Sequence, residues 1–162
     1  MKKILLACCS AALSLAASAQ SGYVPASENI AARQQFADDR FGIFLHWGLY
    51  SLLGQGEWVM TNQDIDFREY RKLAGAFAAP AFNAREWVTA IRQAGARYVC
   101  FTTRHHDGFS LFDTAQSDYN VVDASPLGRD VVRELADECR RQGLGIHFYY
   151  SLIDWWREDA PR

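Results

Sequence analysis

Cysteines, basic clusters and glycine-rich loops are scarce in this sequence, and each scarcity excludes a class of protein. Four cysteines in 162 residues do not make the framework of a disulfide-rich domain. The formal net charge is −2 and the lysines and arginines do not cluster, so we expect no nucleic-acid partner. No glycine-rich turn follows an apolar run, which argues against a dinucleotide-binding fold. We expect a mildly acidic, soluble chain that uses no cofactor.

Long apolar runs are also scarce, and the longest apolar stretch lies at the N-terminus. Two lysines precede an apolar stretch over residues 4–17, which ends in the small-x-small pattern Ala17-Ser18-Ala19. The stretch is too short and too rich in alanine and serine for a membrane span. We predict a cleavable signal peptide over residues 1–19, and hence a secreted or periplasmic protein without a stable membrane anchor. A lipoprotein signal with Cys8 as acceptor is the alternative, although it leaves almost no apolar stretch before the cysteine.

Removal of the signal peptide leaves two cysteines, Cys100 in an apolar run and Cys139 on the apolar side of a predicted helix. Export would permit a disulfide between them. Because they lie on separate elements, we interpret them as small residues of the hydrophobic core.

Beyond the signal peptide, apolar runs alternate with segments of helical periodicity. Runs of the kind that form strands buried on both faces lie at residues 41–47, 98–103 and 144–151. Helical spacing appears at residues 67–77, 83–95 and 130–143, where Asn83 and Asp130 are N-cap residues and Gly95 and Gly143 are stop signals. Residues 49–61 and 110–128 read as loops.

This order predicts an α/β fold with a parallel sheet and right-handed crossovers. The long loops follow the strands, which is the pattern of a (β/α)8 barrel, although a doubly wound sheet has the same order. A barrel needs about 250 residues and eight strands, whereas three strands are predicted here. We therefore expect residues 20–162 to be the N-terminal portion, about three βα units, of an incomplete (β/α)8-like barrel.

Histidines gather at two predicted strand ends. His46 ends the first apolar run, and His105, His106 and Asp107 follow the second. Because carboxyl ends of parallel strands converge on one face, we expect these groups to share a ligand site. We interpret His147, which lies inside the third run, as a core residue instead.

Four motifs in series are similar to one known family. The segment Phe41-Gly42-Ile43-Phe44-Leu45-His46-Trp47-Gly48-Leu49-Tyr50-Ser51 resembles the first strand of the α-L-fucosidases of glycoside hydrolase family 29. Gly56-Glu57-Trp58 resembles their next loop. Thr102-Thr103-Arg104-His105-His106-Asp107-Gly108-Phe109 resembles their second-strand motif, with Arg104 where lysine is usual. Tyr149-Tyr150-Ser151-Leu152-Ile153-Asp154-Trp155 resembles the end of their third strand.

The resemblance implies a retaining exo-α-L-fucosidase that releases terminal fucose from glycans and glycoconjugates by double displacement. It also implies that six residues line the fucose pocket, namely His46, Glu57, Trp58, His105, His106 and Tyr149. Their chemistry suits this role, because imidazoles both donate and accept hydrogen bonds and a carboxylate accepts from two hydroxyls.

Retaining glycosidases use two carboxyl groups about 5–5.5 Å apart. In the resembled family the nucleophilic aspartate comes from a later strand and the acid/base lies further on still, so we expect the catalytic residues beyond Arg162 and assign none within the chain. Asp107, beside Arg104 and two imidazoles, is expected to stay ionised and to orient a histidine or the turn. The isolated chain is then expected to hydrolyse nothing.

Two alternatives stay open. A metal-dependent barrel hydrolase would use His46, His105, His106 and Asp107 as ligands, although His-x-His and His-Glu-x-x-His spacings are missing. The chain would otherwise be a sugar-binding remnant or an inactive fragment of a larger protein.

Overall fold

The computed structural model describes residues 23–157, which fall into two compact units that divide between Asp38 and Asp39. The predicted signal peptide, residues 1–19, lies outside the described residues. Within the described residues, no helix has the length and apolar character needed to cross a bilayer.

The first unit contains all but the last residue of helix α2, Ser27–Asp39, and none of the helix residues is buried. Its larger apolar side chains, Ile30 and Phe36, are both more than half exposed. Gln34 donates a hydrogen bond to Asp38 one turn later, which supports the helix locally.

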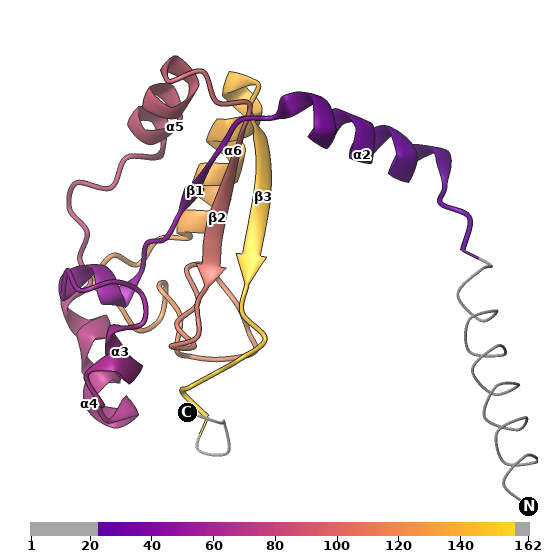
Figure 1. Ribbon diagram of the computed structural model, residues 1–162. Coiled ribbons are helices and arrows are strands. Elements are labelled where there is room, and N and C mark those ends of the chain that lie inside the picture. Colours follow the sequence, from indigo (N-terminus) through magenta and orange to yellow (C-terminus); the bar gives the residue numbers. More distant parts are fainter. Residues whose placement is uncertain (1–22, 158–162) are drawn as a thin grey trace, which may run out of the picture. The chain divides into compact units, whose positions relative to one another are not determined.

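The second unit is built on a three-stranded parallel sheet in the order β1-β2-β3 (Figure 1). Strand β1 spans Gly42–Leu45, β2 spans Tyr98–Arg104 and β3 spans Gly145–Tyr150. The register pairs Phe44 with Cys100 and Cys100 with His147. The predicted α/β organisation with a parallel sheet is confirmed, because each strand lies inside a predicted apolar run or extends it by one residue.

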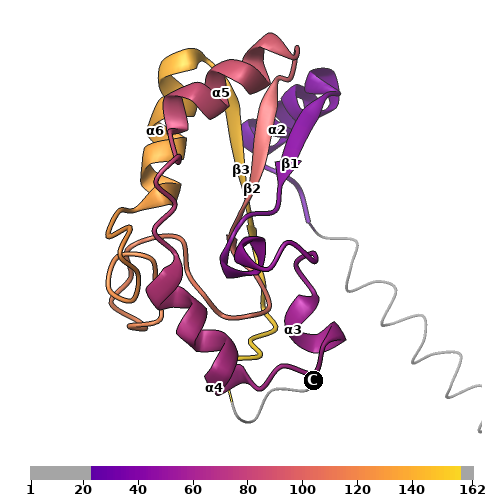
Figure 2. The ribbon, with the colours of Figure 1, turned by 90° about the vertical axis from the view of Figure 1, so that its left-hand side faces the viewer.

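Two helices connect the strands and lie on the same side of the sheet (Figure 2). Helix α5 spans Ala84–Gln93, and the Asn83 side chain accepts a hydrogen bond from the Glu86 amide at its start. Helix α6 spans Val131–Gln142, with Asp130 accepting from the Arg133 amide and Gly143 ending the helix at a φ of 74°. The predicted caps are confirmed, and Gly95 after α5, with a φ of 88°, and Gly143 after α6 both adopt the left-handed conformation that favours glycine.

The hydrophobic core fills the space between these helices and one face of the sheet. Val99 and Phe101 point into it from β2, and both are fully buried together with Leu135 of α6. Cys139 is also buried in this layer, as predicted, whereas Cys100 is half-buried because alternation along β2 turns it to the other face. Both thiols are free.

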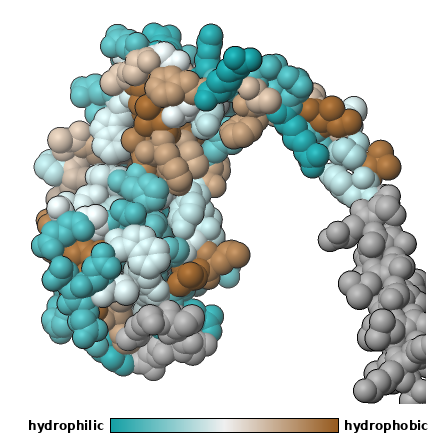
Figure 3. Space-filling view, viewed as in Figure 1, coloured by the Kyte–Doolittle hydropathy of each residue, from teal (hydrophilic) through white to brown (hydrophobic). Residues whose placement is uncertain are grey.

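Helices α5 and α6 do not cover the other face of the sheet. Phe44 is 52% exposed there, and hydrophobic side chains gather over the strands in Figure 3. His147 lies on the same face, exposed and in edge contact with the Tyr98 ring at 4.8 Å. The interpretation of His147 as a core residue is therefore wrong, because an apolar run does not reveal which face of a strand is covered.

Short helices gather near the carboxyl ends of the strands (Figure 1). The predicted loop at residues 49–61 contains the 3-10 helix η1, Leu49–Leu52, and α3, Val59–Asn62. The predicted helix at residues 67–77 is one turn of α-helix, α4 at Phe67–Tyr70, continued as the 3-10 helix η2 at Arg71–Ala76. Apolar spacing cannot distinguish these two helix types, because one turn of each places similar positions on one side.

Candidate functional site

Two threonines at the end of β2 hold the ends of the neighbouring strands. The Thr102 hydroxyl accepts a hydrogen bond from the Trp47 amide and donates to the Leu45 carbonyl, both at 3.2 Å. The Thr103 hydroxyl donates to the Tyr149 carbonyl at 2.9 Å. These bonds continue the ladder past the last regular pairs, so they position His46 on one side of β2 and Tyr149 on the other.

The turn after β2 places the adjacent histidines. The Gly108 amide donates to the His105 carbonyl at 3.1 Å, and Gly108 has a φ of 78°. A Cβ at this glycine would collide with the Asp154 carboxylate and lie 2.7 Å from the Cβ of Trp156. Glycine is thus needed both for the backbone angle and for the close approach of the segment after β3.

Asp107 stabilises this turn through hydrogen bonds to its carboxylate. Its carboxylate accepts hydrogen bonds from the Phe109 amide and from the Tyr70 hydroxyl, each at 3.1 Å. Burial raises the pKa of the Asp107 carboxyl to about 6, while these two hydrogen bonds and Arg104 only partly offset that rise. Asp107 therefore stays mostly ionised near pH 7, although its pKa is raised and not lowered by its surroundings. Of its two expected roles, it orients the turn.

The Arg104 side chain interacts with the segment after β3 and with the histidine turn. Its guanidinium pairs with the Asp154 carboxylate and donates to the Gly108 carbonyl at 3.2 Å. The guanidinium carbon Cζ also lies over the Tyr150 ring, 5.3 Å from its centroid. Arg104 consequently ties the segment after β3 to the histidine turn.

The structure brings all six sequence-predicted site residues together. The His46 and His105 ring centroids are 5.5 Å apart, and Tyr149 lies 6.1 Å from the first and 5.7 Å from the second. His106 lies 4.3 Å from His105 and 4.9 Å from the Trp58 ring. The cluster thus combines side chains from the ends of all three strands with the loop after β1.

Glu57 completes the polar part of the cluster. Within the described part of the chain, one group of histidine, cysteine and acidic side chains brings its ligand atoms within 4.8 Å of one another, and it comprises His46, Glu57 and His105. These are residue types that coordinate zinc, so they are the described residues that could hold a metal ion. The ligand set proposed from the sequence differs, because His106 and Asp107 do not join this group.

The two adjacent imidazoles are both neutral at pH 7. Burial and the neighbouring imidazoles lower the pKa of His105 to about 4. Burial also lowers the pKa of His106, which the Glu57 carboxylate partly offsets. The Nδ1 atom of His105 is buried without a hydrogen-bond partner among the described residues. Neutral imidazoles can donate from one nitrogen and accept at the other, which suits sugar hydroxyls.

Three further aromatic residues border the cluster, and sequence reasoning did not select them. The Phe44 ring lies 4.5 Å from His46, the Tyr50 ring 5.6 Å from His105, and the Trp155 ring 5.0 Å from His106. Alternation offered a signal for Phe44, which is two residues before His46 on one strand face. Tyr50 lies in the one-turn 3-10 helix η1 and Trp155 in the segment after β3, and both are too short for periodicity to carry information.

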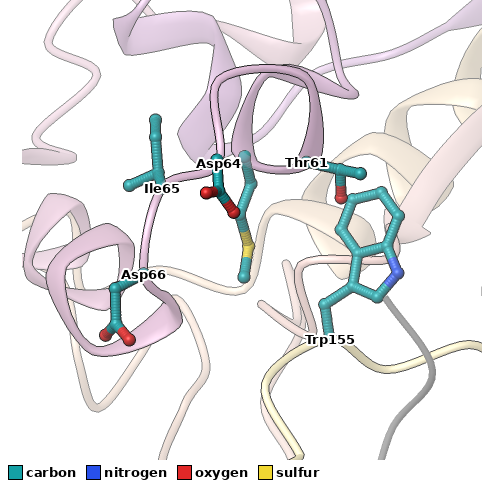
Figure 4. Close-up of a pocket in the computed structure, with 6 residues that line it drawn as sticks. Thr61, Asp64, Ile65, Asp66 and Trp155 are labelled. Carbon is teal, nitrogen blue, oxygen red and sulfur yellow. The ribbon is translucent and has the colours of Figure 1, made fainter.

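A separate pocket of about 440 Å³, whose lining residues Figure 4 shows, shares Trp155 with the surroundings of the cluster. It is lined by α3 and the segment after it, and Trp155 contributes its wall on the side of His106. Its lining residues are Met60, Thr61, Asp64, Ile65, Asp66 and Trp155.

Comparison with known proteins gives a consistent family. A family model described as alpha-L-fucosidase matches residues 10–161. Tissue alpha-L-fucosidase of Rattus norvegicus is 33% identical over 170 residues, which cover 89% of this chain and 37% of that protein. Plasma alpha-L-fucosidase of the same organism is 36% identical over 139 residues, covering 75% of this chain and 30% of the relative.

Solved structures agree. Alpha-L-fucosidase isoenzyme 1 from Paenibacillus thiaminolyticus superposes with a TM-score of 0.76 at 45% identity, covering 79% of this chain and 30% of that one. An alpha-L-fucosidase from Lactobacillus casei in complex with alpha-L-fucose has a TM-score of 0.73 at 38% identity, with 77% and 42% covered. The chain thus spans about a third of the length of the relatives it matches. With the family model covering nearly the whole sequence, the chain belongs to the alpha-L-fucosidase family.

Proposed function

We propose that this chain forms part of the fucose pocket of a retaining exo-α-L-fucosidase that acts on fucosylated glycans. Its three strands are then the first of a (β/α)8-like barrel, and the open face of the sheet faces the barrel interior. The nucleophile and the acid/base are supplied by sequence outside these 162 residues. The observation that carries the proposal is the convergence of His46, Glu57 and His105 beside Tyr149 at the strand ends.

The pocket chemistry suits a deoxy sugar. The Glu57 carboxylate accepts from hydroxyls, and the imidazoles supply both donors and acceptors. Phe44 and Trp58, which are 52% and 43% exposed, offer ring faces for the methyl group and the C–H surface of the sugar. A site that satisfies such hydroxyls rejects sugars that leave its polar groups unpaired.

Calorimetric titration of the full chain with L-fucose tests the pocket. We expect binding by the wild type, and a loss of roughly ten- to a hundredfold in affinity for Glu57→Gln, since a hydrogen bond to a charged group contributes about 1.5–3 kcal/mol. Glu134→Gln is the matched control, because Glu134 lies on α6, away from the cluster, and pairs with Arg129. D-fucose, the mirror image, controls for non-specific binding. Equal binding of the two enantiomers would contradict the proposal.

Turnover of an aryl α-L-fucoside tests where the catalytic carboxyl groups lie. We expect none from the full chain by itself. Turnover that Glu57→Gln or Asp107→Asn abolishes would place a catalytic group inside the chain instead. Fucose binding without turnover by the native, full-length protein would favour the sugar-binding remnant.

A metal site is the second ligand class, and it is favoured only by the grouping of His46, Glu57 and His105. Metal analysis of the purified protein separates the two. If the wild type contains one zinc per chain and Glu57→Gln contains none, the site binds a metal and the fucose proposal is replaced by a metal site.

We also propose that residues 1–19 direct export and are then removed, which places the protein in the periplasm or outside the cell. N-terminal sequencing of the protein recovered from these fractions checks this. An intact N-terminus on cytoplasmic protein would contradict it.

A further inference from the structure

Ser151 holds the ring of His106 from one side. Its Oγ lies 2.6 Å from Nδ1 of His106, and the residue is 2% exposed. Its amide donates to the Arg104 carbonyl at 3.0 Å, directly after the last paired residues of β2 and β3. The hydroxyl is therefore fixed by the sheet and not carried by a loose loop.

The direction of this hydrogen bond follows from the second partner of Ser151. Its Oγ also lies 2.7 Å from the Ile153 carbonyl oxygen, which can only accept. A serine hydroxyl carries one proton, and that proton is used at Ile153. If it pointed to His106 instead, two oxygen atoms would face each other with lone pairs at hydrogen-bond distance. The Oγ thus accepts from an N–H on Nδ1 of His106.

The other nitrogen of His106 is left with a lone pair. A neutral imidazole carries one proton, so a proton on Nδ1 leaves Nε2 bare. Nε2 has no protein partner among the described residues and is not among the buried unpaired atoms. It is therefore available to a hydroxyl that donates.

His105 has the opposite arrangement. Its buried Nδ1 has no partner, and a bare nitrogen is better tolerated in that position than an unpaired N–H. The proton then sits on Nε2, which makes that nitrogen of His105 a donor. Two imidazoles 4.3 Å apart would present a donor and an acceptor side by side.

We propose that Ser151 is a positioning residue that fixes His106 as the Nδ1–H tautomer, so that Nε2 selects a ligand hydroxyl acting as donor. That the ligand is fucose rests on the proposed function. The pairing of one donor with one acceptor matches two neighbouring sugar hydroxyls, of which one accepts and the other donates.

Nitrogen-15 spectra of histidine-labelled full chain test the tautomer directly, because protonated and bare ring nitrogens resonate far apart. At pH 7 we expect His106 to show a protonated Nδ1 and a bare Nε2, and His105 the reverse, with signals assigned through His105→Gln and His106→Gln. A bare Nδ1 in wild-type His106 would overturn the proposal. This measurement requires no ligand and no variant of Ser151.

Substitutions then test selection. Ser151→Ala should leave His106 as a mixture of tautomers and weaken L-fucose binding about tenfold, the equivalent of one hydrogen bond. Ser151→Thr keeps the hydroxyl and should restore both the spectrum and the affinity. Ser125→Ala is the matched control, because it removes a buried hydroxyl that bonds the Val121 carbonyl. Unchanged fucose affinity despite a mixed tautomer would overturn the selective role, whereas a wild type that binds no fucose refutes the proposed function and leaves the tautomer result standing.

Discussion

Two regions of this molecule are equally buried and yet are made of opposite kinds of residue. The apolar layer between the sheet and α5 and α6 contains Val99, Phe101 and Leu135, each fully buried. The polar rim at the strand ends contains His105 and Asp107, which are 4% and 3% exposed. The two regions share β2 and its following turn, so a few residues of chain separate them.

The difference shows how stability and function are divided. Burial in the apolar layer contributes favourable free energy whatever the exact partners are. In the polar rim each buried polar atom needs a specific partner, and the Nδ1 atom of His105 has none. The polar rim therefore holds its side chains in a defined arrangement at a cost in folding stability. Burial in the apolar layer offsets that cost.

The largest expected effect is in the apolar layer. Phe101→Ala should lower the free energy of unfolding by about 3–5 kcal/mol, because a fully buried ring leaves a cavity. Phe44→Ala removes the same side chain from the open face of the sheet, where it is 52% exposed, and should cost under about 1 kcal/mol. Urea denaturation of both variants measures the difference. Equal losses would show that the open face is covered in solution.

The apolar layer was predictable from the sequence because its rules are local. Continuous apolar runs mark β1, β2 and β3, and Asn83 and Asp130 mark the starts of α5 and α6. Which face of the sheet is open could not be predicted, since a run with apolar residues on both faces does not distinguish them. His147 was misplaced for this reason.

The polar rim was predictable only in part. The positions of His46, His105 and His106 at strand ends indicated one shared site, because parallel strands converge at their carboxyl ends. Glu57, Trp58 and Tyr149 came from the family resemblance. Ser151 and Tyr70 carried no signal, since their roles depend on contacts 45 and 37 residues away in the sequence.

A second substitution separates backbone strain from contact in the polar rim. Gly108→Val should cost about 3 kcal/mol, because it forces a β-branched residue to positive φ and also collides with Asp154 and Trp156. Gly128→Val is the matched control: its φ is 58° but nothing lies within 4 Å of its added Cβ, so about 1 kcal/mol is expected. Thermal unfolding of the pair measures the contact alone. Equal costs would mean that the segment after β3 does not rest on this turn.

The pH dependence of stability should reveal two opposed groups in the rim. The folded pKa of Asp107, about 6, is above its usual value, so its contribution is lost as pH rises through 6. The folded pKa of His105, about 4, is below its usual value, so its contribution is lost as pH falls toward 4. Between pH 4 and 6 the two slopes oppose each other in the wild type.

Asp107→Asn should remove one slope and leave the other. Stability is then expected to rise between pH 4 and pH 6 by about 2 kcal/mol more than in the wild type. Asp66→Asn is the control, since Asp66 is an exposed N-cap carboxylate that accepts from the Arg68 amide. Chemical denaturation at a series of pH values measures both. A slope that Asp107→Asn leaves unchanged would assign the titration to another group.

The smallest expected effect concerns the bond that ties β3 to the rim. Thr103→Val keeps the shape of the side chain but removes the hydrogen bond to the Tyr149 carbonyl, so about 1 kcal/mol of stability should be lost. Thr114→Val removes a hydroxyl that accepts from the Gln116 amide on an exposed loop, and should cost almost nothing. Because Tyr149 belongs to the cluster around His105, the first variant should also weaken L-fucose binding while the second does not. A loss of stability without a loss of binding would mean that Tyr149 is held in place by its ring contacts alone, and the rim would then be partly independent of the sheet that carries it.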